Sequence, residues 1–266
     1  MTTPVNDLSR QWLNLIAAPA MWILSTLPQV THWGRSAKEF SDLNDSLLVP
    51  HGIAFSIWLP IFIGCIGYAI LQALKANRTR GIFRRSGWWT GAGFAGVCIW
   101  SLFSGWGSPM LSRWGTALIF IPTVCCLVKA MLELTRGKQA LDKMERIWVW
   151  APISLIAGWT SLAIFLNWTP IVVDAFGSSV SNVLPNLLIL GVALIWALFN
   201  TLRSSGNILY AFPIIWGLAW LAFKIFTQYP ISLPIGFEAL LGLAIVIFAV
   251  LIKPKNTQGD LENIRI

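Results

Sequence analysis

Eight apolar segments, each about as long as a membrane-spanning helix, follow one another along the chain and restrict the folds open to it. They lie near residues 11–31, 52–75, 87–107, 111–132, 147–169, 183–202, 207–226 and 233–252. A helix needs about 20 residues to cross the ~30 Å hydrocarbon core of a bilayer. Of the 266 residues, 56% are hydrophobic and 11% are charged, whereas roughly a quarter are charged in soluble domains. The sequence therefore predicts an all-α, polytopic integral membrane bundle of about eight transmembrane helices in a lipid bilayer.

The basic residues are concentrated in alternate connections between these segments. The second, fourth and sixth connections and the tail hold Lys75, Arg78, Arg80, Arg84, Arg85, Arg136, Lys138, Lys143, Arg146, Arg203, Lys253, Lys255 and Arg265, and the others hold Arg35, Lys38 and Arg113. Basic connections stay on the cytoplasmic side of a membrane. We therefore expect a multi-pass protein of the inner (plasma) membrane with both termini in the cytoplasm. Topology explains the net charge of +8, and we expect no nucleic-acid partner.

The sequence gives little support to an enzyme. It contains two histidines and no Ser-His-Asp set, paired acids, zinc motif or glycine-rich phosphate loop. The four cysteines, Cys65, Cys98, Cys125 and Cys126, lie inside apolar segments without a CxxC pair, as expected of small buried hydrophobic residues. A metal site built from His32, Glu39, Asp42, Asp45 and His51 is the weaker alternative to solvation at helix ends. We expect neither catalysis, nor a metal site, nor a required cofactor.

Three short stretches have a more specific pattern. "PHGIAFSIW" runs from Pro50 to Trp58, "CIWSLF" contains Trp100, and "GWTSLAIFLNW" contains Trp159, Ser161, Ala163, Leu166 and Asn167. These stretches resemble the TspO/MBR-related tryptophan-rich sensory protein family, which has a Pro, Gly, Phe, Trp pattern at the start of its second helix. The third stretch is similar to the W-x-S-x-A-x-x-L-N signature of that family. The form resembles most closely the larger bacterial members, which add helices to the TspO core.

The resemblance implies a division of the chain and a ligand. Residues 1–170 would form a five-helix core with a lid loop at 34–50, residues 171–252 three additional transmembrane helices, and residues 253–266 a cytoplasmic tail. The core would bind a small hydrophobic or tetrapyrrole-type ligand, such as a porphyrin or haem, beneath the lid, and the protein would act as a sensor or regulator. The ligand-binding residues would be Pro50, His51, Gly52, Phe55, Trp58, Trp100, Trp159, Ala163 and Asn167. For His51, a position at a helix end facing water is the alternative to a ligand contact.

Two features keep other functions open. Lys224 and Glu238 fall inside predicted helices near the same end, where we expect them to form an intramembrane ion pair. A snorkelling lysine and an ion pathway are the alternatives, and the second of these would indicate a secondary transporter of a small apolar solute. Small residues at spacings of four, Gly87, Gly91 and Ala95 beside Ala92 and Gly96, predict a close helix contact. If that contact were with another chain, the protein would be a structural partner subunit or a homodimer.

Overall fold

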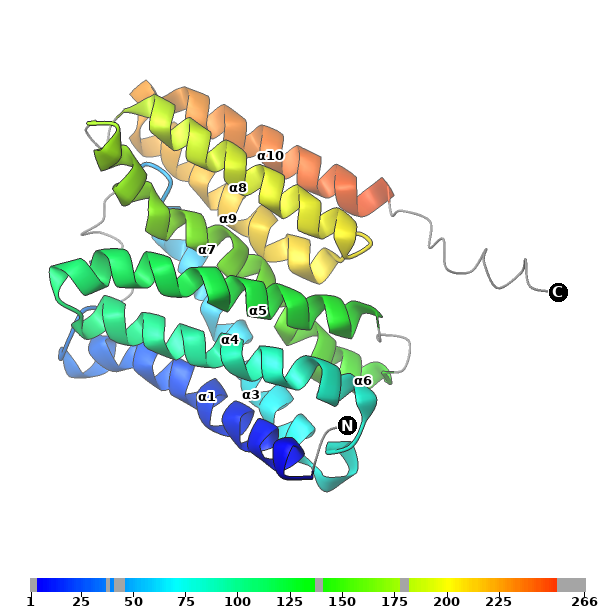
Figure 1. Cartoon of the computed structure of the whole chain (residues 1–266). Helices are drawn as coiled ribbons and strands as arrows, with labels where there is room; N and C mark the ends of the chain where they lie inside the picture. Colours follow the sequence, from blue (N-terminus) through cyan, green and yellow to red (C-terminus); the bar gives the residue numbers. More distant parts are fainter. Residues whose placement is uncertain (1–3, 37–38, 41–45, 137–140, 178–181, 253–266) are drawn as a thin grey trace.

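The computed structural model describes residues 4–36, 39–40, 46–136, 141–177 and 182–252, and this part of the chain is an all-helical bundle (Figure 1). The long helices are α1 (Pro4–Thr31), α3 (Trp58–Ala73), α4 (Gly81–Trp106), α5 (Thr116–Arg136), α7 (Ala151–Ala175), α8 (Val183–Arg203), α9 (Ile208–Gln228) and α10 (Leu233–Ile252). Short helical turns lead into four of them, at Gly52–Ile57, Leu111–Gly115, Lys143–Trp150 (including α6, Lys143–Glu145) and Pro230–Ser232. These eight long helices confirm the predicted fold class and correspond to the eight predicted segments.

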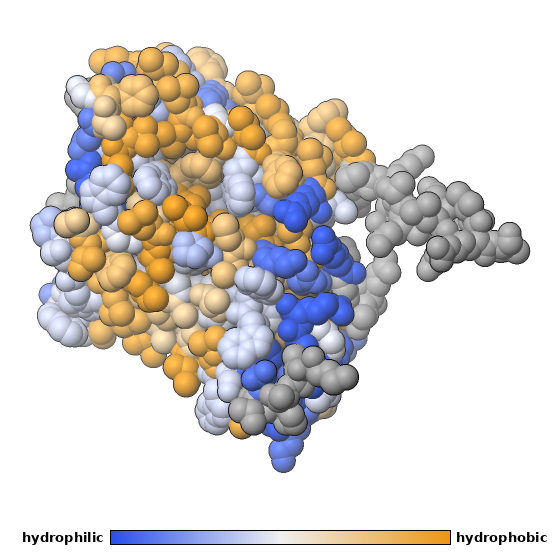
Figure 2. Space-filling model, in the orientation of Figure 1, coloured by the Kyte–Doolittle hydropathy of each residue, from blue (hydrophilic) through white to orange (hydrophobic). Residues whose placement is uncertain are grey.

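By length and composition, seven of these helices could cross a membrane. The eighth long helix is α4, whose glycine and serine residues make it less apolar. It lies between α1 and α5 (Figure 1). The outer surface is strongly apolar over much of the face in Figure 2. The protein is therefore a multi-pass membrane protein.

The small residues of α4 allow it to approach α1 and α5 closely. A Cβ atom added to Gly87 would lie 2.7 Å from the Arg10 side chain of α1, and one added to Gly91 would lie 2.6 Å from Leu13. On the other side, Gly96 faces Thr123 of α5. The predicted close contact is confirmed, but its partners are helices of the same chain. Of the predicted stripes, α1 and α5 cover Gly87, Gly91 and Gly96, whereas Ala92 is exposed.

Two of the last three helices, α8 and α9, pack directly on α7, and α10 packs on α8 and α9. Gly158 of α7 lies against the backbone of α9 at Tyr210. Ser161 Oγ, one turn further along α7, accepts hydrogen bonds from Trp196 Nε1 of α8 at 3.1 Å and from the Tyr210 hydroxyl at 3.0 Å. A close backbone approach and a buried polar group with two partners therefore fix α8 and α9 against α7.

The start of α1 and the end of α10 lie at the same end of the bundle (Figure 1). Most of the strongly hydrophilic residues visible in Figure 2 gather at this end, where the basic connections were predicted. A buried ionic network joins α1 to its neighbours here: Asp7 pairs with Arg84 of α4, and Arg10 donates to Gln72 Oε1 of α3 at 3.0 Å. Asp7 and Arg10 are 2% and 1% exposed, so this network is part of the interior. The predicted tail, 253–266, lies outside the described residues.

Candidate functional site

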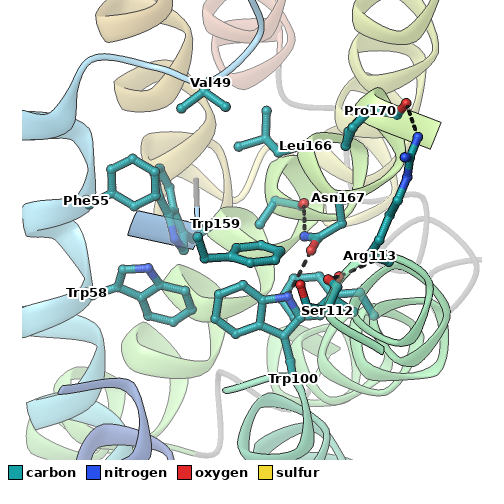
Figure 3. Close-up of a pocket in the computed structure, with 14 residues that line it drawn as sticks. Val49, Phe55, Trp58, Trp100, Ser112, Arg113, Trp159, Leu166, Asn167 and Pro170 are labelled. Atoms are coloured by element: carbon teal, nitrogen blue, oxygen red, sulfur yellow. Dashed lines mark hydrogen bonds between the residues drawn. The ribbon is translucent and has the colours of Figure 1, made fainter. Parts of the chain in front are cut away.

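Six of the nine predicted ligand-binding residues line one cavity (Figure 3). They are Phe55, Trp58, Trp100, Trp159, Ala163 and Asn167. The rest of the lining consists of residues that were not predicted to bind the ligand: Phe40, Val49, Ser112, Arg113, Thr116, Phe120, Leu166 and Pro170. Because these residues come from the lid loop and from α3, α4, α5 and α7, the cavity exists only when the core helices pack together.

Aromatic rings form most of the wall. Trp159 is 2% exposed, and its ring lies edge to face with Phe55 at 6.0 Å and with Trp58 at 6.2 Å between ring centroids. Trp100 lies across the cavity from Val49 (Figure 3) and contacts Phe120 at 5.4 Å and Phe40, edge on, at 5.8 Å. Edge-to-face pairs are favourable arrangements that hold each ring in place. The wall is therefore a fixed set of indole faces and edges rather than loose aliphatic packing.

Asn167 is the polar centre of this wall. Its Oδ1 accepts a hydrogen bond from Trp100 Nε1 at 2.9 Å, and its Nδ2 donates to the Ala163 carbonyl oxygen at 2.7 Å. A buried indole N–H needs an acceptor. The sequence predicted a hydrogen bond from Asn167 to the ligand; in the structure its oxygen instead sets the orientation of the Trp100 ring. The W-x-S-x-A-x-x-L-N pattern thus has a physical basis in the pairing of its last residue with a tryptophan two helices away.

The cavity has one charged wall residue among those the structure describes, Arg113. It lies on the π-helical turn Leu111–Gly115 between α4 and α5, a distortion that is frequent at functional sites. Its Nη2 donates to the Pro170 carbonyl oxygen of α7 at 2.9 Å (Figure 3). The same atom pairs with the Asp174 carboxylate. The sequence assigned Arg113 only to topology, because an isolated arginine in a short connection gives no sign of what it faces.

Two described residues of the predicted lid loop, Phe40 and Val49, line the cavity, and the end of the loop is held by α9. Of the predicted 34–50 loop, residues 37–38 and 41–45 lie outside the described part. Lys224 Nζ donates to the Val49 carbonyl oxygen at 2.9 Å, and the His51 amide donates to the Trp220 carbonyl oxygen at 3.3 Å. Trp216 Nε1 donates to the Ala54 carbonyl oxygen at 3.0 Å. One of the three additional helices therefore positions the roof of the cavity.

Three predicted site residues lie elsewhere. Pro50 lines a second, smaller apolar cavity of about 30 Å³ between α7, α8 and α9. The His51 ring stacks on Trp220 with centroids 5.5 Å apart, and its Nδ1 accepts from the Ile53 amide at 3.4 Å. Gly52 is exposed. The three start the turn that leads into α3, and His51 caps that turn on the α9 side.

The predicted ion pair between Lys224 and Glu238 is not formed in the described structure. Lys224 reaches the lid loop, whereas Glu238 Oε1 faces Gly191 of α8. Glu238 Oε2 is buried and has no hydrogen-bond partner there. The expectation was wrong because the sequence shows how far each residue lies from the α9–α10 turn but not the face of the hairpin on which it projects.

The cavity is small in this conformation. Its volume is about 60 Å³, although the depression around it encloses about 650 Å³ of empty space when the part open to the exterior is counted. One water needs roughly 10–15 Å³ measured in this way. The cavity therefore has room for a few waters, and a larger ligand would require its wall residues to move apart.

Residues 11–252 match a family model described as TSPO-like protein. The chain belongs to the TSPO-like family. The match confirms the resemblance seen in the three sequence stretches, and it also includes α8, α9 and α10, where no motif was recognised. A search of curated proteins and a search of solved structures each found no match.

Proposed function

We propose that this TSPO-like protein binds a small hydrophobic ligand of the tetrapyrrole type in the Trp58–Trp100–Trp159 cavity and acts as a membrane sensor or regulator. The observation that supports the proposal most directly is the convergence of these three rings from α3, α4 and α7 on one cavity. Fixed indole rings offer faces to a flat ligand, and ligand sites are typically apolar with a few placed polar groups.

The size of the cavity suggests how binding would be sensed. A porphyrin is larger than this cavity of about 60 Å³, so its binding would require wall residues such as Val49 to move. Val49 of the predicted lid and Ala54 of the turn that follows it accept hydrogen bonds from Lys224 and Trp216 of α9. A change in the loop would therefore be transmitted to α9 and, through its packing, to α10. Binding of a ligand in the cavity would in this way alter the positions of α9 and α10.

The charge pattern supports an orientation in the inner membrane. The described basic residues at the end of the bundle that holds the start of α1 include Arg78, Arg80, Arg84, Arg136 and Arg203. The positive-inside rule places this end in the cytoplasm. The cavity and its lid would then face the outside, so the proposed ligand arrives from that side.

A porphyrin titration tests the proposal. Protoporphyrin IX added to the detergent-purified protein should quench tryptophan fluorescence to saturation, and Trp58→Phe and Asn167→Ala should both weaken the binding. Trp12→Phe is the matched control, because Trp12 is 56% exposed on α1 and does not line the cavity. Quenching that does not saturate, or that is the same in all four proteins after checks of folding, would refute the cavity as the porphyrin site.

Transport of a small apolar solute is the second candidate, and Glu238 is the observation that favours it. A carboxyl group with a buried oxygen and no hydrogen-bond partner there is unusual in a membrane helix and often marks an ion or proton pathway. If Glu238→Gln abolishes solute uptake by proteoliposomes while porphyrin quenching persists, transport becomes the better assignment. No uptake by either protein supports the sensor instead, and uptake that the substitution leaves unchanged would exclude Glu238 from the transport pathway.

A further inference from the structure

Arg113 has a donor that the structure leaves unused. The Nε atom of Arg113 is buried and has no hydrogen-bond partner among the described residues. Two acceptors, the Pro170 carbonyl oxygen and the Asp174 carboxylate, lie at its Nη2. A buried donor without a partner costs free energy, so the site would gain from another acceptor. The side chain lines the aromatic cavity beside Asn167 and Pro170 (Figure 3).

The geometry of a guanidinium group indicates which acceptor fits. Nε and Nη2 form one edge of the planar group, and a carboxylate binds such an edge with both oxygens. Asp174 accepts a hydrogen bond from Nη2 of Arg113, but none from Nε. The Asp174 carboxylate therefore does not occupy the whole Nε–Nη2 edge. The Asp174 side chain is 58% exposed, so its pair with Arg113 is weak and readily replaced.

We propose that Arg113 is the anchor for a carboxylate of the ligand and that Asp174 holds this position while the cavity is empty. The inference rests on the proposed function and deepens it: the ligand is an apolar, aromatic-stacking molecule with an acidic group at one end. The apolar body lies against the tryptophans, and the acid replaces Asp174 on the Nε–Nη2 edge of Arg113. Because Asp174 and Pro170 are both on α7, exchange of the partner of Arg113 also alters the contact between α7 and the Leu111–Gly115 turn.

The other polar wall residues do not offer this chemistry. Thr116 Oγ1 donates to the Ser112 carbonyl oxygen at 2.7 Å, and the Asn167 amide binds Trp100 and Ala163. His51, which the resemblance placed among the ligand-binding residues, stacks on Trp220 of α9 and is not part of this wall. Arg113 is therefore the cation that a ligand acid would meet in this cavity.

A pair of probes with the same porphyrin ring, one with free acids and one with methyl esters, tests the inference. Protoporphyrin IX has two carboxylates and its dimethyl ester has none. The wild-type protein should bind the acid about tenfold more tightly than the ester, as expected for a charge-assisted hydrogen bond. Arg113→Gln should remove this preference, and Arg113→Lys should restore only part of it, because lysine keeps the charge but lacks the planar edge. Asp174→Asn should strengthen binding of the acid and leave the ester unchanged.

The outcomes separate the two proposals. If the ester binds to saturation and the acid binds no more tightly, or if Arg113→Gln keeps the preference, the inference is refuted while the cavity stands. If neither probe binds to saturation, the porphyrin function and the inference both fail. Should Arg113→Gln not fold, Asp174→Asn decides alone: a gain for the acid only supports the anchor, and no gain overturns it.

Discussion

Replacing Gly158 by alanine should loosen the contact between α7 and α9. A Cβ atom at this position would lie 3.0 Å from the Tyr210 carbonyl carbon and closer still to its oxygen, whereas ordinary contact begins at 3.4 Å. The obstacle is backbone, so the helices must separate. Overpacking of this kind costs about 1–3 kcal/mol, and stretching the Tyr210–Ser161 hydrogen bond adds roughly 1 kcal/mol. We expect a loss of about 2–4 kcal/mol in the free energy of unfolding.

The assay is reversible unfolding in mixed micelles, followed by circular dichroism as the fraction of dodecyl sulfate rises. Gly52→Ala is the matched control, because no atom lies within 4 Å of an added Cβ there. A glycine-to-alanine change in open space is neutral or slightly stabilising. If Gly158→Ala is as stable as Gly52→Ala, the close approach of α7 and α9 is not present in the protein, and the attachment of the last three helices to the core must be revised.

Three further changes test other parts of the structure. Asp7→Asn should cost about 3–5 kcal/mol in the same assay, because it leaves the buried Arg10 and the paired Arg84 without their carboxylate; a loss below 1 kcal/mol would contradict the buried network. Glu238→Gln should leave stability unchanged or raise it, since no ion pair is lost, and a marked loss would reveal a partner. Lys224→Met should speed porphyrin exchange in stopped-flow quenching by releasing the lid loop, and unchanged rates would show that α9 does not hold the lid.

The helices were predictable because each is a long apolar run whose length is fixed by the bilayer. The aromatic wall was also predictable, but only through resemblance: composition alone gives 16 tryptophans without saying which face a cavity. Trp58, Trp100 and Trp159 could be selected because they lie in three motif stretches, and packing then brings them together.

The roles of Arg113, Lys224 and His51 could not be predicted. They depend on how each helix is oriented about its axis and on contacts between distant parts of the chain, which a single sequence does not reveal. Arg113 is one arginine in a short connection, and its place beside Asn167 follows from the packing of α5 on α7. The contact of Lys224 with Val49 joins residues far apart in the chain. The motif correctly placed His51 at the turn before α3. Only the fold shows that its ring lies on Trp220 of α9 rather than under the lid.

The most direct test of the central claim is fluorine NMR of protein labelled with 5-fluorotryptophan, recorded before and after addition of protoporphyrin IX. Single Trp→Phe variants assign the resonances of Trp58, Trp100 and Trp159. The proposed site predicts that these three shift or broaden with one saturation curve, while exposed tryptophans such as Trp12 and Trp33 stay unchanged. If the three resonances stay fixed while others respond, or if no resonance responds, the porphyrin does not bind in this cavity.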